Sequence, residues 1–161
     1  MSVRRLAPKE LQPASFAFSD ENLAWAKAQI AKYPPGRQAS AVIAILWRIQ
    51  EQHEGWVSEA AIRAVADLLE MPYIRVLEVA TFYTMFRFRP EGRHHIEVCT
   101  NLSCALAGAD TLITQLCDRL GIAEGGTTAD GEFTVHRAEC LAACGGATAV
   151  QVDGRWVEYA T

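Results

Sequence analysis

The sequence predicts an α+β protein in which a four-helix bundle precedes a small α/β domain. Apolar residues recur at helical spacing between residues 19 and 90, and this spacing gives way to strand-like alternation after residue 93. Four of the five cysteines then form two close pairs in the second half of the chain. We therefore expect an extended arm over residues 1–18, a helical bundle over 19–90 and a cysteine-bearing domain over 91–161.

Each of the four helices has a start signal or a clear apolar stripe. Ser19 and Ser58 are candidate N-caps of the first and third helices. The second helix runs from about Gln38 to His53, and Pro72 opens the fourth helix in its first turn. The positions expected to face inward are Leu23, Ala26, Ile30 and Tyr33, then Val42, Ile43, Leu46, Ile49 and His53, then Ile62, Val65, Ala66 and Leu69, and finally Val76, Val79, Ala80 and Tyr83.

Two features of the helical segment need an interpretation. His53 lies on an apolar stripe, and we interpret it as a packing or capping residue. The segment Ala80-Thr-Phe-Tyr-Thr-Met-Phe86 is rich in aromatic residues. It is either core against the second domain or a partner surface, because Phe, Tyr and Met are favoured in interface cores.

The second half predicts a strand, a helix, a strand and a hairpin. Residues 94–100 alternate like a strand, which places His94 and His95 on opposite faces, and we interpret both as surface residues. A helical stripe then includes Cys117 and ends at Gly121, so Cys117 is expected in the core. Residues 133–137 form the next strand, and Asp153-Gly154 is a hairpin signal between residues 149–152 and 155–159. The two cysteine loops would then lie at neighbouring strand ends.

The two cysteine pairs, Cys99 with Cys104 and Cys140 with Cys144, form a candidate four-thiolate site. Structural zinc sites favour C-x2–4-C loops, and the first pair lies at the loose end of that range. A 2Fe–2S cluster has two irons and suits wider loops. Gly145-Gly146 would also let backbone N–H groups approach a sulfide without a Cβ in the way. The spacing favours a cluster, and it leaves zinc, disulfides and free thiols open.

Composition and charge exclude several other classes. Half of the residues are hydrophobic, 21% are charged and the net charge is −4, which indicates a globular chain without a basic nucleic-acid surface. The longest apolar run, residues 41–47, is too short to span a membrane. No apolar stretch follows the two N-terminal arginines, so no secretory signal is expected. An odd cysteine count without secretion argues against a disulfide framework.

The two cysteine segments, Cys99-Thr-Asn-Leu-Ser-Cys104 and Cys140-Leu-Ala-Ala-Cys144, together with residues 80–86, resemble one family. It is the thioredoxin-like 2Fe–2S ferredoxin subunit of NADH:quinone oxidoreductase (respiratory complex I). The resemblance runs from about residue 20 to the end of the chain. It implies a thioredoxin-like fold for the second domain and one 2Fe–2S cluster ligated by these four cysteines.

The resemblance also implies a function and a partner. The chain would be a redox subunit that is not itself catalytic, and its cluster would exchange single electrons with the FMN of a flavin-bearing, NADH-oxidising subunit. No G-x-G-x-x-G or P-loop occurs in this chain, so FMN and NADH would lie on the partner. Complex I subunits of this kind are peripheral on the cytoplasmic face of the bacterial inner membrane, and this is the expected location.

The sequence departs from the family pattern beside the second cysteine pair. The family usually has glycine where this chain has Ala142, and proline where it has Ala147-Thr148. Both changes would act on the properties of the cluster rather than on its ligation. A NAD-reducing hydrogenase or a NAD-dependent formate dehydrogenase is an alternative host. A zinc-stabilised interaction module is the alternative of another class, and a thiol redox enzyme is disfavoured because the chain has no C-x-x-C.

Overall fold

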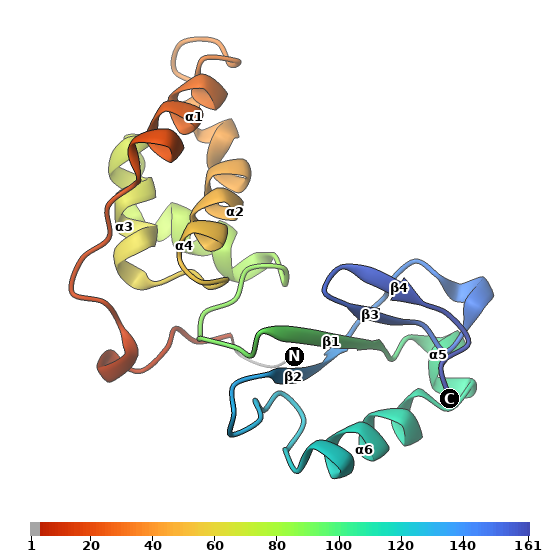
Figure 1. Cartoon of the computed structure of the whole chain (residues 1–161). Coiled ribbons are helices and arrows are strands. Elements are labelled where there is room, and N and C mark those ends of the chain that lie inside the picture. Colours follow the sequence, from red (N-terminus) through yellow and green to blue (C-terminus); the bar gives the residue numbers. More distant parts are fainter. Residues whose placement is uncertain (1–3) are drawn as a thin grey trace. The chain divides into compact units, whose positions relative to one another are not determined.

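The computed structural model describes residues 4–161, which form two compact units. One unit ends at Pro90 and the other begins at Glu91. The described part of the first unit consists of helices and loops, whereas the second combines a four-stranded sheet with helices (Figure 1). The observed structure is therefore α+β, as predicted. Within residues 4–161, no helix has the length and apolar character needed to cross a membrane.

The N-terminal unit contains four α-helices and two short 3-10 helices. They are η1 (Lys9–Leu11), α1 (Asp20–Ile30), η2 (Gln38–Ala41), α2 (Val42–Gln52), α3 (Glu59–Leu68) and α4 (Tyr73–Phe82). The predicted N-caps are confirmed. The Ser19 hydroxyl accepts a hydrogen bond from the N–H of Asn22 at 3.2 Å, and Ser58 does the same for Ala61. These bonds satisfy N–H groups in the first turn that have no partner within the helix.

One apolar core joins these helices. Its largest fully buried side chains are Phe86, Ile45, Leu46, Ile49, Ile62 and Leu69. The predicted inward positions of α3 are confirmed, but Tyr33 and Tyr83 are 41% and 38% exposed. They were assigned wrongly because α1 ends at Ile30 and α4 ends at Phe82, so both tyrosines lie beyond their helices. The arrangement of the four helices as a bundle stays a prediction.

The aromatic segment 80–86 is divided between core and surface. Ala80 and Phe86 are fully buried in the core of the N-terminal unit itself. Phe82, Tyr83 and Met85 are exposed. Neither interpretation of the whole segment is therefore sufficient, and its role as a partner surface stays a prediction for the three exposed residues.

The described part of the N-terminal arm packs on the helical unit. Leu6, Phe16 and Phe18 contact the apolar core, and the N–H of Ala7 donates to the carbonyl of Phe88 at 3.0 Å. Residues 4–18 therefore belong to the fold of this unit rather than to a free tail. Residues 1–3 of the predicted arm lie outside the described residues.

The C-terminal unit is a mixed sheet with helices packed against it. Its elements are β1 (His94–Cys99), α5 (Leu102–Leu106), α6 (Ala109–Leu120), β2 (Phe133–Ala138), η3 (Cys144–Gly146), β3 (Val150–Val152) and β4 (Arg155–Val157). The strand order is β2-β1-β3-β4, in which β1 and β2 are parallel and the other pairs are antiparallel. The helix α6 packs against β1 and β2 (Figure 1). Gly121 ends α6 with a φ of 66°, and Asp153-Gly154 joins β3 to β4, as predicted.

Candidate metal centre

The parallel pair β1 and β2 brings both cysteine loops to one edge of the sheet. Cys99 is the last residue of β1 and lies opposite Ala138, the last residue of β2. The N–H of Thr100 also donates to the carbonyl of Ala138 at 2.9 Å, which extends the pairing by one step. Because the carboxyl ends of parallel strands meet at one edge, the loop after β1 and the loop after β2 begin side by side. This position of the loops was predicted from the element order.

The first pair of cysteines is buried and in mutual contact. Cys99 and Cys104 are 2% and 1% exposed. Cys104 lies in the short helix α5, whose N-cap Asn101 accepts a hydrogen bond from the N–H of Leu102 at 2.7 Å. The α5 turn therefore folds Cys104 back towards Cys99, and both residues belong to one buried cluster.

Burial and hydrogen bonds act in opposite directions on these two thiols. Burial opposes ionisation of Cys99, but the N–H groups of Asn101 and Leu141 and the thiol of Cys104 donate to its sulfur and hold its pKa below the ordinary value. For Cys104, burial raises the pKa despite an N–H bond from Ala149, and the nearby Cys99 adds to the increase. Of these two thiols, Cys99 therefore ionises more readily than Cys104.

The second pair lies on the exposed loop between β2 and β3. Cys140 and Cys144 are both exposed. The N–H of Ala142 donates to the Cys140 sulfur at 3.4 Å. Ala142 has a φ of 56°, a left-handed conformation that costs a residue with a Cβ about 1–2 kcal/mol. This conformation explains why glycine suits position 142 in the family pattern.

Three contacts show that the two loops meet. Leu141 and Ala143 of the second loop pack against the buried cluster that contains Cys99 and Cys104. The N–H of Cys99 donates to the carbonyl of Ala149, just beyond the second loop, at 3.0 Å. The Thr148 hydroxyl donates to the carbonyl of Ala107, just after α5, at 3.3 Å. Within residues 4–161, no three Cys, His, Asp or Glu side chains gather in an arrangement suited to holding one metal ion. The ligand set of four cysteines stays a prediction.

Gly146 has a different role from the predicted one. Its N–H donates to the carbonyl of Ala143 at 3.0 Å within η3, so this group is used by the loop itself. Gly146 is buried against Glu158, whereas a Cβ on Gly145 would meet no atom within 4 Å. The tight packing beside β4, rather than an approach to sulfide, requires glycine at position 146.

Cys117 and His53 have structural roles. Cys117 lies on the buried face of α6 in the core, where burial, followed by the charges of Glu124 and Asp118, raises its pKa. Its assignment to the core is confirmed. His53 follows the last residue of α2 and stacks on Trp56 with ring centroids 4.6 Å apart, which confirms packing as its role.

His94 and His95 are only partly exposed, and they face different carboxylates. The His94 side chain is 39% exposed and its Nδ1 lies 2.7 Å from Asp153. The His95 side chain is only 18% exposed, and its Nδ1 lies 2.9 Å from Glu91, which also contacts His136 at 2.9 Å. The surface assignment of His95 was wrong because Glu91, before the strand, folds over β1 and β2, and no local pattern indicates this.

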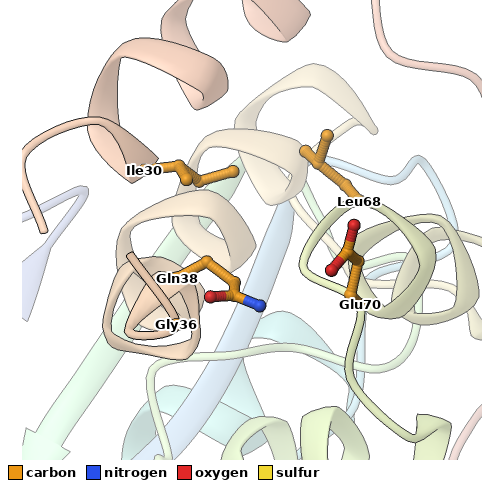
Figure 2. Close-up of a pocket in the computed structure, with 5 residues that line it drawn as sticks. All are labelled: Ile30, Gly36, Gln38, Leu68 and Glu70. Carbon is orange, nitrogen blue, oxygen red and sulfur yellow. The ribbon is translucent and has the colours of Figure 1, made fainter. Parts of the chain in front are cut away.

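The N-terminal unit has a hollow of about 340 Å³ that contains no predicted site residue. It is lined by Ile30, Gly36, Gln38, Leu68 and Glu70. Figure 2 shows the Gln38 amide and the Glu70 carboxylate at this hollow, with Ile30 and Leu68 beside them. All five cysteines lie in the other unit, so this hollow is not part of the candidate metal centre.

The fold and the paired cysteine loops define a thioredoxin-like protein with a candidate metal centre. A family model of thioredoxin-like [2Fe-2S] ferredoxins matches residues 26–161. The chain therefore belongs to the thioredoxin-like [2Fe-2S] ferredoxin family. This confirms the resemblance seen in the sequence.

Two curated relatives are components of bacterial NADH-quinone oxidoreductases. The chain is 53% identical over 154 residues to one such component from Rhizobium meliloti (strain 1021), covering 94% of this chain and 55% of the relative. It is 43% identical over 147 residues to the corresponding component from Rickettsia bellii (strain RML369-C), covering 91% and 88%. The chain thus spans little more than half of the first relative and most of the second.

Solved structures share the fold at lower identity. A NAD+-reducing [NiFe]-hydrogenase in the air-oxidised state superposes with a TM-score of 0.63 at 23% identity, covering 75% of this chain and 20% of that one. A NAD+-reducing [NiFe]-hydrogenase in the H2-reduced state gives 0.64. At this identity the likeness shows a shared fold and does not assign a host complex.

Proposed function

We propose that this chain is an electron-transfer component of a NADH-quinone oxidoreductase and holds one 2Fe–2S cluster on Cys99, Cys104, Cys140 and Cys144. The observation that supports it is the meeting of the two cysteine loops at one sheet edge, where Leu141 and Ala143 of the second loop pack against the cluster that contains Cys99 and Cys104. Family membership and the names of the relatives point to the same cofactor and host.

The residues at this edge fit a cluster of this kind. Four thiols are the donor set that 2Fe–2S ferredoxins use. The backbone N–H of Ala142 donates to the sulfur of Cys140, and such a bond stabilises negative charge on sulfur. When bound, the cluster supplies one-electron transfer, because four thiolates leave no open coordination position for a substrate.

The two pairs would have different environments. Cys99 and Cys104 are shielded by the sheet and by α5, so their side of the site is dry. Cys140 and Cys144 are exposed, so their side is open to a partner protein. We therefore assign the exposed second loop to the side from which electrons enter and leave.

The partner follows from the motifs that this sequence lacks. It has no dinucleotide or P-loop motif, so hydride transfer from NADH requires a flavin-bearing, NADH-oxidising subunit that carries FMN. The chain would associate with that subunit in the peripheral arm of the complex, on the cytoplasmic face of the bacterial inner membrane. The curated relatives favour this host over a hydrogenase or a formate dehydrogenase.

The test is the metal content of the purified chain, followed by EPR after dithionite reduction. We expect two irons, two sulfides and a rhombic S = 1/2 signal per chain. A colourless protein that contains one zinc would contradict the electron-transfer function. It would support a zinc-stabilised interaction module instead. The isolated chain should not oxidise NADH with an artificial acceptor, and activity without bound flavin would contradict the proposed division between the subunits.

A further inference from the structure

Trp156 reaches the second cysteine loop from the neighbouring edge strand. It lies in the middle of β4, paired with Gln151 of β3, and its indole N–H donates to the carbonyl of Leu141 at 3.0 Å. The residue is 58% exposed, so most of its ring is not used in the core. The hydrogen bond is therefore the specific contact that the indole makes with the loop.

The carbonyl held by Trp156 belongs to the same peptide group as an N–H that faces a cysteine. The peptide between Leu141 and Ala142 carries the Leu141 oxygen at one side and the Ala142 N–H at the other. That N–H donates to the sulfur of Cys140, with the nitrogen 3.4 Å from the sulfur. Because a trans peptide is planar with its C=O and N–H opposed, fixing the oxygen also fixes the direction of the hydrogen.

This peptide needs an external constraint. It is the central peptide of the turn from Cys140 to Ala143, and Ala142 has a left-handed φ of 56°. Rotation of the peptide by about half a turn would turn the N–H away from the sulfur, and it would relieve the cost that the left-handed region imposes on alanine. The hydrogen bond from the Trp156 indole to the Leu141 carbonyl opposes that rotation.

We propose that Trp156 is a positioning residue that holds the Leu141–Ala142 peptide so that its N–H donates to the sulfur of Cys140. The inference rests on the proposed function, because Cys140 is one of the four proposed ligands. N–H bonds to a ligand sulfur favour the reduced, more negative state of an iron–sulfur centre. Trp156 would therefore raise the reduction potential and slow the loss of iron without touching the metal.

The test compares the wild-type chain with W156F after loading with iron and sulfide. We expect the same iron content, a more negative reduction potential, a changed EPR line shape and about 2- to 10-fold faster bleaching by a chelator. W47F is the matched control, because Trp47 is also exposed and donates its indole N–H to Glu51 in the other unit, at 2.9 Å. W47F should leave all these properties unchanged.

A second variant separates the hydrogen bond from the ring. Benzothienylalanine at position 156 keeps the two fused rings but lacks the N–H, so it should fold as the wild type does and reproduce the changes seen in W156F. If that variant has the wild-type reduction potential, EPR signal and bleaching rate, the proposed role of Trp156 is wrong. The proposed function would not be affected by that result. A wild-type chain that binds no iron would instead overturn the proposed function, and the inference with it.

Discussion

Glu158 occupies the space that a side chain on Gly146 would need. A Cβ built on Gly146 would lie 2.6 Å from the Cβ and the Cδ of Glu158. The two residues belong to segments that also pair through their backbones, since the N–H of Tyr159 donates to the carbonyl of Gly146 at 2.8 Å. The end of the second cysteine loop is thus packed closely against the chain that leaves β4.

Gly146→Ala should therefore destabilise the C-terminal unit by about 1–3 kcal/mol, as overpacking does. Gly145→Ala is the matched control, because a Cβ there would meet no atom within 4 Å. Urea unfolding of both variants measures the difference. Equal stability of the two variants would contradict the close packing between Gly146 and Glu158.

Cysteine substitutions should divide into two classes. Serine at Cys99, Cys104, Cys140 or Cys144 should abolish or alter the cluster, because each would remove one thiolate ligand. Cys117→Ser should retain two irons and the wild-type EPR signal, with a loss of about 1–3 kcal/mol in stability, because it places a hydroxyl in an apolar core. Iron analysis and denaturation measure both effects. Loss of iron in the Cys117 variant equal to that in the others would refute the ligand assignment.

Arg4 should stabilise the helical unit through the end of α4. Its guanidinium donates to backbone carbonyls of residues 80, 81, 83, 84 and 86 and lies 4.9 Å above the Phe88 ring. Carbonyls at a helix C-terminus have no partner within the helix, so these bonds replace water. Arg4→Ala should cost about 1–3 kcal/mol, a range typical of bonds to a charged group.

The control for Arg4 is its neighbour Arg5, which is exposed. Arg5→Ala should change the free energy of unfolding by less than about 0.5 kcal/mol, and urea unfolding of the two variants measures the contrast. Neither variant should change the iron content, because the cysteines belong to the other unit. If Arg4→Ala removed the cluster, the arm would contribute to the site as well as to the helical unit.

Features that depend on neighbouring residues could be predicted from the sequence. The caps at Ser19 and Ser58, the hairpin at Asp153-Gly154 and the strand-end position of the cysteine loops follow from short motifs and element order. The sequence did not indicate Trp156 as part of the site. The hairpin signal places Trp156 on an edge strand, but which carbonyl its indole reaches depends on how that strand lies beside a loop 15 residues earlier.

The contacts of Glu91 and Arg4 were missed for the same reason. Glu91 contacts His136 because β2 lies beside β1, and Arg4 reaches carbonyls more than 70 residues away in the sequence. Periodicity reports which face of an element is buried and gives no information on such pairs. The left-handed conformation of Ala142 is different, because the usual glycine of the family pattern is a signal from which such a backbone could have been inferred.

The hairpin between β3 and β4 should lose stability in acid. The Asp153 carboxylate accepts hydrogen bonds from the His94 ring and from the N–H of His95, and these bonds lower the pKa of Asp153. A carboxyl group with a lower pKa in the folded state stabilises the fold above its unfolded pKa of about 3.9, and this contribution is lost as the pH falls through the folded value. The side chain is 41% exposed, so solvent screens the effect.

Asp153→Asn keeps the size of the side chain and tolerates the left-handed φ of 49° at this position. It should be less stable than the wild type at pH 7, and the difference should shrink as the pH is lowered below about 4. Urea unfolding followed by the amide signals of residues 91–161 measures this. Asp118→Asn, an exposed change in the same unit, corrects for other effects of acid. A stability difference that is constant from pH 7 to pH 3 would show that the charge on Asp153 does not hold the hairpin to β1.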